Sequence, residues 1–363
     1  MYVFHFNYLF ISEEGYFFMA RIIGRGYSFE DVLIVPKYNK IHSRKEVSFK
    51  TWVTKNHSIE IPLIVANMDT TCEVEMAVAI GKLGGLGVIH RFMSIQKQKK
   101  QVIEVKNYGL LSAAALGVKD YEERIKALVE AGIDIVVLDI AHGHSKYAGK
   151  ILDYIKENYP LVDVMAGNIA TKDSAEYFFS KGADAIKVGI GPGSMCTTRI
   201  MTGAGVPQLT AIMDAYEATQ GRIPICADGG VCNPGDLAKA LGAGANTVMS
   251  GSIFAGTKET PGKIVKSGGR GFKLYRGMAS FDATLKKKKL DGEDIHEIIF
   301  IEGEKAMVSY KGPVKEVVKR YLGGLASGMT YVGALDMASF IGKVDFLEIS
   351  AAGYKESVAH GIN

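Results

Sequence analysis

Short apolar runs of strand length recur along the chain and alternate with longer amphipathic segments. Most of the runs are continuously apolar, as expected for parallel strands that are buried on both faces. There are eight, at residues 61–66, 85–90, 111–118, 133–141, 162–169, 185–190, 223–228 and 246–253. Helix-length segments lie between them, at 72–82, 94–105, 121–131, 145–158, 172–181, 207–219 and 233–241. The pattern predicts parallel strands connected by helices.

Eight such units favour an α/β fold of the closed (β/α)8 type, the TIM barrel; an open, doubly wound sheet is the alternative. Several helical segments are followed directly by glycine, the commonest residue just past a helix end. We expect a single catalytic domain over residues 19–363, preceded by an extension or disordered N-terminus at 1–18. A last helix is expected at about 314–322, with a glycine-rich turn after it.

In this fold the chemistry lies on the loops that follow the strands. The loops after seven of the predicted strands carry polar or glycine-rich clusters, at 67–70, 90–91, 139–145, 167–168, 189–199, 228–230 and 250–252. Each cluster alone is also explained by a helix cap or a turn. Their placement on one rim of the barrel favours a functional site, and the loops after the last two strands commonly bind phosphate.

The loop at 189–199 is the main candidate for chemistry. It begins with three glycines and a proline, and then carries Cys196 and Thr198. The free N–H groups of such a loop can cradle a phosphate, and a cysteine thiolate can attack an electron-poor carbon. The carboxylate of Asp228 can accept hydrogen bonds from a ribose diol. Together these groups imply a nucleoside monophosphate ligand; a glycine-rich turn with an inert, buried cysteine is the alternative.

Composition narrows the class of protein. The chain is 47% hydrophobic and 23% charged, as in ordinary globular proteins, and its net charge of +4 is small. This charge does not indicate a nucleic-acid partner but suits a small anionic substrate. Four cysteines without metal-ligand spacing predict a reducing, cytoplasmic location. No segment has the long apolar run of a membrane span, so no membrane partner is expected.

The alternation of strand-length and helix-length segments ends after the eighth predicted strand. Residues 268–279 are rich in glycine and basic residues, and four consecutive lysines at 286–289 precede an acidic stretch. A solvated surface excursion would explain this composition. The alternative is a flap, at about 280–305, that closes over the site.

These motifs resemble the IMP dehydrogenase/GMP reductase family. The resemblance rests on residues 189–199, 202–203, 206–208, 66–70, 167–168, 228–230, 250–252 and 275–278, and the match runs from about Gly26 to His360. It implies a TIM barrel that is usually a homotetramer. It also implies that Cys196 attacks carbon 2 of the purine and that hydride passes between this carbon and a nicotinamide cofactor.

The resemblance also implies roles for individual residues. The phosphate would be held by Ser194, Gly230, Gly251, Ser252 and Tyr275, the ribose by Asp228 and the base by Met68, Met278 and Ala279, with Gly229 and Gly277 also lining the substrate site. The nicotinamide cofactor would contact Asp139, Asn168, Gly189 and Gly191. In the dehydrogenase, a potassium ion would bind the backbone carbonyls of Gly191, Gly193 and Cys196.

Three departures favour the reductase within this family. Residues 105–109 lead directly into the third strand, where dehydrogenases usually carry an inserted pair of regulatory CBS domains. No arginine occurs between Arg276 and Arg320, although the dehydrogenase flap uses an Arg-Tyr pair to activate water. The stretch from Ser280 to Glu302 is short, as in reductases. The expected reaction is NADPH-dependent deamination of GMP to IMP and ammonia, with Thr198 handling the leaving amine.

Other features leave alternatives open. Where reductases carry a glutamate that works with this threonine, the chain has Phe281, so Asp282 is expected to shuttle the proton, with Glu302 or Glu304 as alternatives. The segment 350–353 is more similar to dehydrogenases. The alternatives are therefore an IMP dehydrogenase without CBS domains, which would convert IMP to XMP with NAD, and a catalytically silent homologue that binds purine nucleotides.

Overall fold

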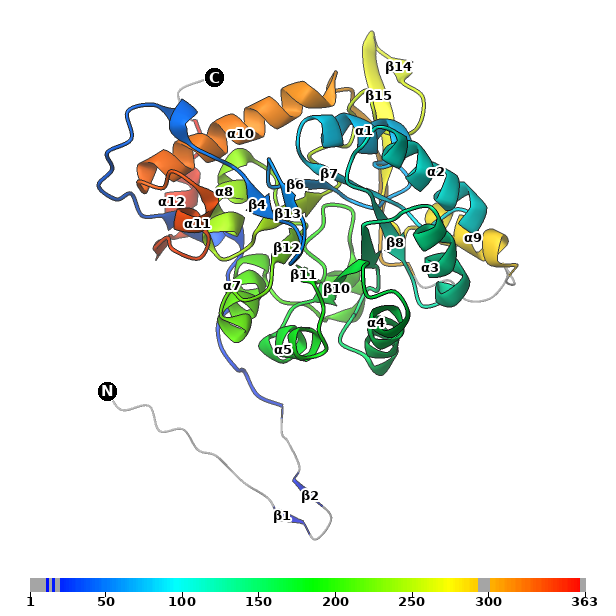
Figure 1. Cartoon of the computed structure of the whole chain (residues 1–363). Helices are drawn as coiled ribbons and strands as arrows, with labels where there is room; N and C mark the ends of the chain where they lie inside the picture. The colour runs from blue at the N-terminus through cyan, green and yellow to red at the C-terminus, as the bar shows by residue number, and fades with distance from the viewer. Residues whose placement is uncertain (1–10, 13–14, 17–19, 293–300, 360–363) are drawn as a thin grey trace.

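Eight parallel strands close into a barrel in the computed structural model of the chain (Figure 1). The structure describes residues 11–12, 15–16, 20–292 and 301–359. Most of the expected N-terminal extension, at 1–10, 13–14 and 17–18, therefore lies outside the described residues, as does part of the flap at 293–300. The barrel order runs from β6 to β13 and back to β6, which confirms the closed fold and excludes an open sheet.

The barrel strands fall within the eight predicted runs. They are β6 (Leu63–Val65), β7 (Leu86–Ile89), β8 (Ala113–Leu116), β9 (Ile135–Leu138), β10 (Asp163–Ile169), β11 (Ala185–Val188), β12 (Ile225–Asp228) and β13 (Thr247–Ser250). The helices between them are α1 (Val74–Lys82), α2 (Ile95–Asn107), α3 (Tyr121–Glu130), α4 (Lys146–Asn158), α5 (Lys172–Ser180), α6 (Thr198–Thr202), α7 (Gln208–Thr219) and α8 (Pro234–Gly242). Only residues 108–112 separate α2 from β8, so no domain is inserted there.

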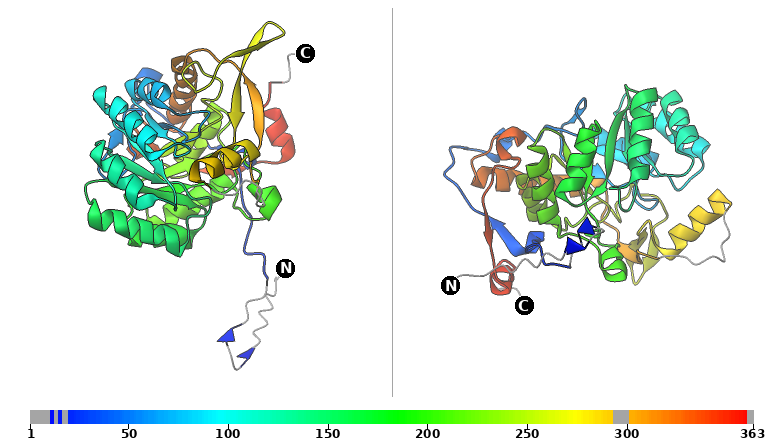
Figure 2. Two further views of the ribbon diagram at one scale, coloured as in Figure 1. Left: turned by 90° about the vertical axis from the view of Figure 1, so that its right-hand side faces the viewer. Right: turned by 90° about the horizontal axis from the view of Figure 1, so that it is seen from below.

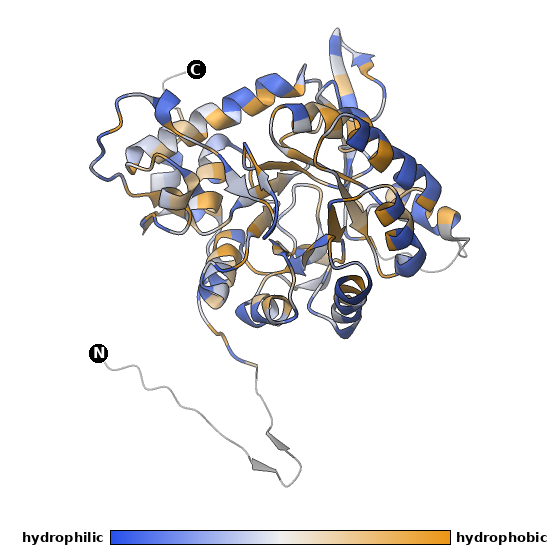
Figure 3. Ribbon diagram, in the orientation of Figure 1, coloured by the Kyte–Doolittle hydropathy of each residue, from blue (hydrophilic) through white to orange (hydrophobic). Residues whose placement is uncertain are grey.

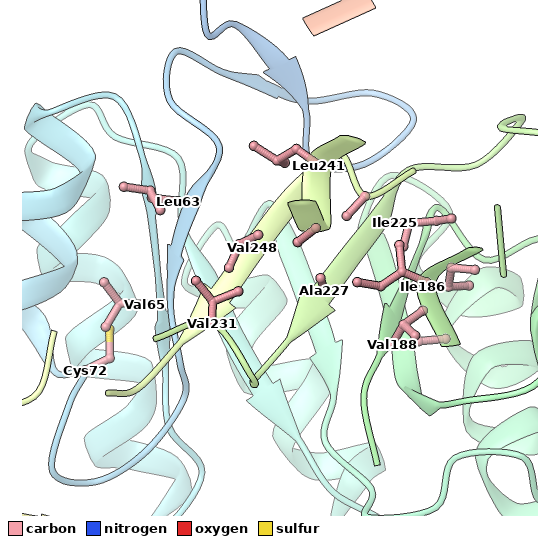
Figure 4. Close-up of a cluster of buried hydrophobic side chains, with 14 of the residues drawn as sticks. Leu63, Val65, Cys72, Ile186, Val188, Ile225, Ala227, Val231, Leu241 and Val248 are labelled. Carbon is pink, nitrogen blue, oxygen red and sulfur yellow. The ribbon is translucent and has the colours of Figure 1, made fainter. Parts of the chain in front are cut away.

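The strands are mainly apolar because both of their faces are buried. Side chains alternate along a strand, so Leu63 and Val65 pack against the surrounding helices while Ile64 points into the barrel. Figure 4 shows part of the outer cluster, including Leu63, Val65, Ile186 and Val188. Figure 3 shows the resulting pattern, with orange strands at the centre and helices whose blue sides face outward.

A polar cluster lies at the amino end of the barrel. The hairpin of β4 (Thr51–Trp52) and β5 (Ser58–Ile59) contributes Val53 and Ile59 to the interior core. At the start of β10, the Asp163 carboxylate accepts hydrogen bonds from Thr54 Oγ1 (2.5 Å), Asn56 Nδ2 (2.7 Å) and His57 Nδ1 (2.9 Å). One carboxylate therefore ties the hairpin to the barrel.

The elements after β13 form a separate layer at the side of the barrel. Strands β14 (Val265–Ser267), β15 (Arg270–Arg276) and β16 (Lys305–Ser309) make an antiparallel sheet that projects from the body (Figure 2). Helix α9 (Phe281–Asp291) leaves the end of β15 and contains the four lysines. The expected surface excursion is thus, in its described part, a helix attached to a hairpin.

The last helix is longer than predicted. Helix α10 (Val314–Tyr331) runs through Gly323 and Gly324, where the sequence predicted a turn. A Cβ atom at Gly324 would lie 2.2 Å from Pro234 Cβ on α8, and one at Gly328 would lie 3.1 Å from Ala238 Cβ. These glycines therefore allow α10 to pack closely on α8, and packing outweighs the low helix propensity of glycine.

The remaining elements cover the side of the barrel near α10. They are η1 (Phe29–Asp31), β3 (Val32–Ile34), η2 (Arg44–Glu46), α11 (Met337–Phe340), β17 (Phe346–Glu348) and α12 (Ala351–Glu356). Strand β17 pairs with β3, which joins the two ends of the described chain. The short strands β1 (Ile11–Ser12) and β2 (Gly15–Tyr16) pair with each other. None of the described helices is long and apolar enough to cross a membrane.

The substitution Asp163→Asn is expected to lower the free energy of unfolding by about 2 kcal/mol at neutral pH, because three donors lose a charged acceptor. Burial alone raises the pKa of Asp163, but the hydrogen bonds from Thr54, Asn56 and His57 outweigh it and hold this pKa below its usual value. The stabilisation is therefore present above the unfolded pKa of about 3.9 and is lost as pH falls through the folded pKa.

Urea denaturation of both proteins at several pH values measures this effect. The difference in the free energy of unfolding between the wild type and Asp163→Asn should be constant near neutral pH and should shrink below about pH 4. Asp345→Asn is the matched control, because Asp345 forms an exposed ion pair with Lys37 (2.9 Å) and should change stability by less than about 1 kcal/mol. Equal effects of the two substitutions would contradict the role of Asp163.

Candidate active site

A cavity of about 300 Å³ opens at the carboxyl ends of the barrel strands. It gathers loops that are distant in sequence, as the barrel fold requires. The predicted site residues that line it are Met68, Asp139, Asn168, Gly189, Gly191, Gly193, Ser194, Cys196, Thr198, Asp228, Gly229, Gly230, Gly251, Ser252, Tyr275, Gly277, Met278 and Ala279. Asp282 is the predicted site residue that does not line it.

A chain of hydrogen bonds leads away from the exposed cysteine. The Cys196 thiol donates to Thr198 Oγ1 at 3.1 Å, and the Thr198 hydroxyl donates to Glu302 Oε2 at 2.6 Å. A proton can therefore move between the neighbourhood of the sulfur and a carboxylate through one hydroxyl. Glu302 is the acid at this position, whereas Asp282 was expected from the sequence and Glu302 was only an alternative.

Backbone pairing fixes where Glu302 lies. Its N–H donates to the carbonyl of Ala279 (3.1 Å), and its carbonyl accepts from the N–H of Thr197 (2.9 Å). Two residues later, Glu304 donates to Met195 (2.9 Å) and accepts from Gly277 (2.8 Å). The segment 302–304 thus lies between the cysteine loop and residues 277–280, and the pairing register directs Glu302 to Thr198.

The expected proton shuttle, Asp282, lies elsewhere. Its carboxylate accepts from Lys305 Nζ at 2.6 Å, and this hydrogen bond holds the pKa of Asp282 below its usual value. Asp282 is in the first turn of α9, whereas Glu302 follows the helix and returns to the cysteine loop. The structure therefore brings together Cys196, Thr198 and Glu302 and leaves Asp282 outside this group.

The residues expected to hold the phosphate lie together in the cavity and are small or carry hydroxyl groups. Ser194 Oγ lies 3.3 Å from Tyr275 Oη, and Ser250 Oγ lies 3.3 Å from Ser252 Oγ. A Cβ atom at Gly251 would lie 2.6 Å from Tyr275 Oη, so only glycine permits this approach. Burial raises the pKa of Tyr275, which keeps its hydroxyl protonated as a donor for an anion.

A buried lysine joins the residues expected to hold the ribose and the cofactor. Lys187 Nζ donates to Asp228 Oδ2 at 2.6 Å and to Asn168 Oδ1. Asn168 Nδ2 donates to the same Asp228 oxygen at 2.9 Å and to the Gly189 carbonyl at 2.7 Å. The sequence analysis missed Lys187 because it lies inside a run interpreted as apolar. A charged residue in a strand buried on both faces was the signal that could have revealed it.

The cavity continues toward Asp139, where there is room for a second ligand. Arg91 Nε donates to Asp139 Oδ2 at 3.1 Å. Beyond this pair lies an adjoining pocket of about 240 Å³, whose lining includes Lys119, Lys287 and an ion pair between the buried Arg124 and Asp120 (2.8 Å). A carboxylate beside several cations suits the ribose and pyrophosphate of a dinucleotide. The residues present therefore fit a nicotinamide dinucleotide that reaches the site from this side.

The backbone carbonyls expected to bind potassium belong to the cysteine loop. The Gly193 carbonyl already accepts the N–H of Cys196 at 3.0 Å, although a carbonyl oxygen has a second lone pair. Across the described part of the chain, no group of three or more His, Cys, Asp or Glu side chains could hold a metal ion. The potassium site stays a prediction.

Helix α9 of the flap is attached to the barrel through a buried carboxylate. Asp69 accepts hydrogen bonds from Arg276 at the end of β15 and from Lys286 Nζ on α9 (3.1 Å). Burial raises the pKa of Asp69, but these two cations outweigh it and hold the pKa below its usual value. Lys286, one of the four consecutive lysines, therefore holds the flap helix to the barrel rim.

The fold and the site define a class of protein. A TIM barrel whose rim carries an exposed cysteine beside a hydroxyl–carboxylate pair, in a cavity lined by glycines and hydroxyls and continued by an adjoining pocket, suits covalent chemistry on a small polar ligand. Residues 26–360 match the family model described as the IMP dehydrogenase / GMP reductase domain, and the chain belongs to this family. It is thus an NAD(P)-dependent oxidoreductase of purine nucleotides.

The named relatives include both IMP dehydrogenases and GMP reductases. The chain is 38% identical to inosine-5'-monophosphate dehydrogenase of Borreliella burgdorferi, over 94% of this chain and 98% of that protein. It is 39% identical to the enzyme of the same name from Cryptosporidium parvum, over 94% and 96%. It is also 32% identical to GMP reductase of Leishmania donovani, over 93% and 97%.

The four cysteines should differ sharply in their reaction with iodoacetamide. Cys196 and Cys232 are exposed, whereas Cys72 and Cys226 are buried. Burial raises the pKa of Cys226 to about 12 and also raises that of Cys72. Partial burial also raises the pKa of the exposed Cys232. Because the thiolate is the reactive form, mass spectrometry of the folded protein should find the label first on Cys196 and more slowly on Cys232.

IMP should slow labelling at Cys196, which lines the cavity, more than at Cys232, which does not. The denatured protein, in which all four cysteines should react, is the control. Labelling of Cys72 or Cys226 in the folded protein, or equal protection of both exposed cysteines, would contradict the site described here.

Proposed function

We propose that the chain is an IMP dehydrogenase, which oxidises IMP to XMP. The sulfur of Cys196 adds to carbon 2 of the purine. When bound, the nicotinamide supplies the hydride acceptor, and the oxidised purine stays attached to Cys196 as a thioimidate. Water then adds to carbon 2, and the S–C2 bond breaks to release XMP and the thiolate.

The observation that carries the proposal is the relay from Cys196 through Thr198 to Glu302. Water that attacks carbon 2 must lose a proton, and the Thr198 hydroxyl can accept it while passing its own proton to Glu302. Their 2.6 Å hydrogen bond is short enough for such a transfer. The relay supplies a base in a chain that has no arginine between Arg276 and Arg320.

The named relatives favour this direction over the reductase that the sequence analysis preferred. Four dehydrogenases are 34–39% identical to the chain, whereas two GMP reductases and two further dehydrogenases are 31–32% identical. The alignments with the Borreliella and Cryptosporidium dehydrogenases extend over only 399 and 392 residues, so short dehydrogenases are among these relatives. The direct connection from α2 to β8 therefore does not argue for the reductase.

GMP reductase is the second candidate, and the absence of an arginine from the flap favours it. In that direction Glu302 donates a proton through Thr198 to the amine that leaves carbon 2, and NADPH supplies the hydride. The same three side chains thus serve either reaction with the proton moving in opposite directions.

Further properties extend the proposal. Residues 19–363 form one catalytic domain, and four copies assemble into a homotetramer in the cytoplasm. The nucleotide phosphate binds Ser194, Tyr275 and the neighbouring glycines, and the base lies against Met68 and Met278. Potassium binds the carbonyls of the cysteine loop in the dehydrogenase reaction. The family resemblance and the joint lining of one cavity support these assignments.

Near-ultraviolet absorbance of the nicotinamide tests the direction. Purified protein with IMP, NAD and potassium should show a rise, because NADH forms. With GMP and NADPH it should show no change. A fall in the second mixture and no rise in the first would reject the dehydrogenase in favour of the reductase. Cys196→Ala, which cannot form the covalent bond, is the inactive control for both mixtures.

Glu302→Gln should lower steady-state turnover by about 10²- to 10⁴-fold, because the relay loses its proton acceptor. Hydride transfer precedes the water step in the dehydrogenase, so the variant should still release a burst of roughly one equivalent of NADH per Cys196. Stopped-flow absorbance measures both phases. Glu304→Gln, which changes an exposed side chain two residues away, should behave as the wild type. Unchanged turnover in Glu302→Gln would exclude the relay.

A further inference from the structure

Lys187 is a charged residue inside the barrel. It lies on β11, where Ile186 and Val188 pack against the outer helices and Ala185 faces the interior. Because side chains alternate along a strand, Lys187 faces the interior with Ala185, and only 1% of its surface is exposed. A charge buried inside the barrel lowers the stability of the fold unless it is paired and hydrogen-bonded.

The partners of Lys187 all belong to the candidate site. Its ammonium group contacts Asp228 Oδ2 and Asn168 Oδ1, and Asn168 Nδ2 contacts the same Asp228 oxygen. Two donors therefore hold one oxygen of the Asp228 carboxylate. Among the described residues, both side-chain hydrogen bonds to this carboxylate go to Oδ2 and none goes to the other oxygen, Oδ1. Asp228 also lines the cavity, so this oxygen is left for a ligand.

The charge of Lys187 is maintained by the carboxylates around it. Burial alone lowers the pKa of Lys187, but Asp228 and Asp139 outweigh this effect and hold the pKa above its usual value. The ammonium group thus compensates the charge of Asp228 in a region of low polarity. Without it, the carboxylate would lose both its counter-charge and one of the two donors that set its orientation.

We propose that Lys187 is a positioning residue, which holds the Asp228 carboxylate turned toward the ribose hydroxyls of the purine nucleotide. The inference rests on the nucleotide site of the proposed function and is independent of the direction of the reaction. A carboxylate fixed before binding loses little conformational freedom when it accepts the diol. Loss of the lysine should therefore weaken the contribution of the ribose hydroxyls selectively.

Equilibrium binding of IMP and of its 2′,3′-dideoxy analogue, measured by calorimetry, tests this role. Wild-type protein should bind IMP about 10- to 100-fold more tightly than the analogue, because hydrogen bonds to a charged acceptor are lost. In Lys187→Met, the affinity for IMP should fall at least about tenfold, while the affinity for the analogue changes little. The preference for the ribose hydroxyls should thus largely disappear.

Lys156→Met is the matched control, because Lys156 Nζ forms a hydrogen bond (2.8 Å) with Asp184, next to the other end of β11. It should preserve the preference for IMP. If Lys187→Met does not fold, Lys187→Gln, which keeps a donor but removes the charge, takes its place in the same measurement. Equal weakening of both ligands, or an unchanged preference, would overturn the proposal, as would a wild type that does not distinguish them.

The proposed direction of catalysis stands or falls separately. Binding needs no turnover, so a protein that binds IMP with the expected preference but fails both absorbance tests would retain the role of Lys187 and lose the proposed reaction. A protein that oxidises IMP, but whose lysine variants keep the wild-type preference for IMP over the analogue, would retain the proposed reaction and lose the role of Lys187.

Discussion

Closure of the eight-stranded parallel barrel is the constraint on which the rest of the molecule depends. Because all strands run the same way, the loops that follow them meet at one rim, and residues as distant as Met68 and Gly251 line one cavity. Closure also buries both faces of every strand, so side chains that point inward must be apolar or fully paired. Ile64 is apolar, and Lys187 is paired with Asp228.

Cation–carboxylate pairing is repeated around the rim. Asp69 pairs with Arg276 and Lys286, Asp139 with Arg91, and Asp228 with Lys187. Burial raises the pKa of both Asp69 and Asp139, yet nearby cations outweigh it and hold these pKa values below the usual range. The cations thus pair with and orient all three carboxylates: Asp69 attaches helix α9, and Asp139 and Asp228 line the cavity.

The reactive centre depends on a second, more local constraint. The cysteine loop and segment 302–304 are about a hundred residues apart in sequence, and backbone hydrogen bonds hold them together. This pairing makes Thr198 and Glu302 neighbours, while Asp282 remains with Lys305 on the flap. Backbone pairing thus fixes which carboxylate lies beside Thr198, and α9 is held to the barrel separately through Lys286.

The sequence by itself determined the barrel and most of its rim, because both depend on local signals. Continuous apolar runs predicted the strands, and the loops after them contained the cavity-lining residues from Met68 to Ser252, whereas Tyr275 to Ala279 were expected only through the family resemblance. Contacts between distant segments were decided only by the tertiary structure. Gly324 stays helical because Pro234 packs against it, Glu302 replaces Asp282 because strand-like pairing sets its register, and Lys187 matters because β11 turns it inward. No local pattern encodes such contacts, since each depends on which distant residue is brought alongside.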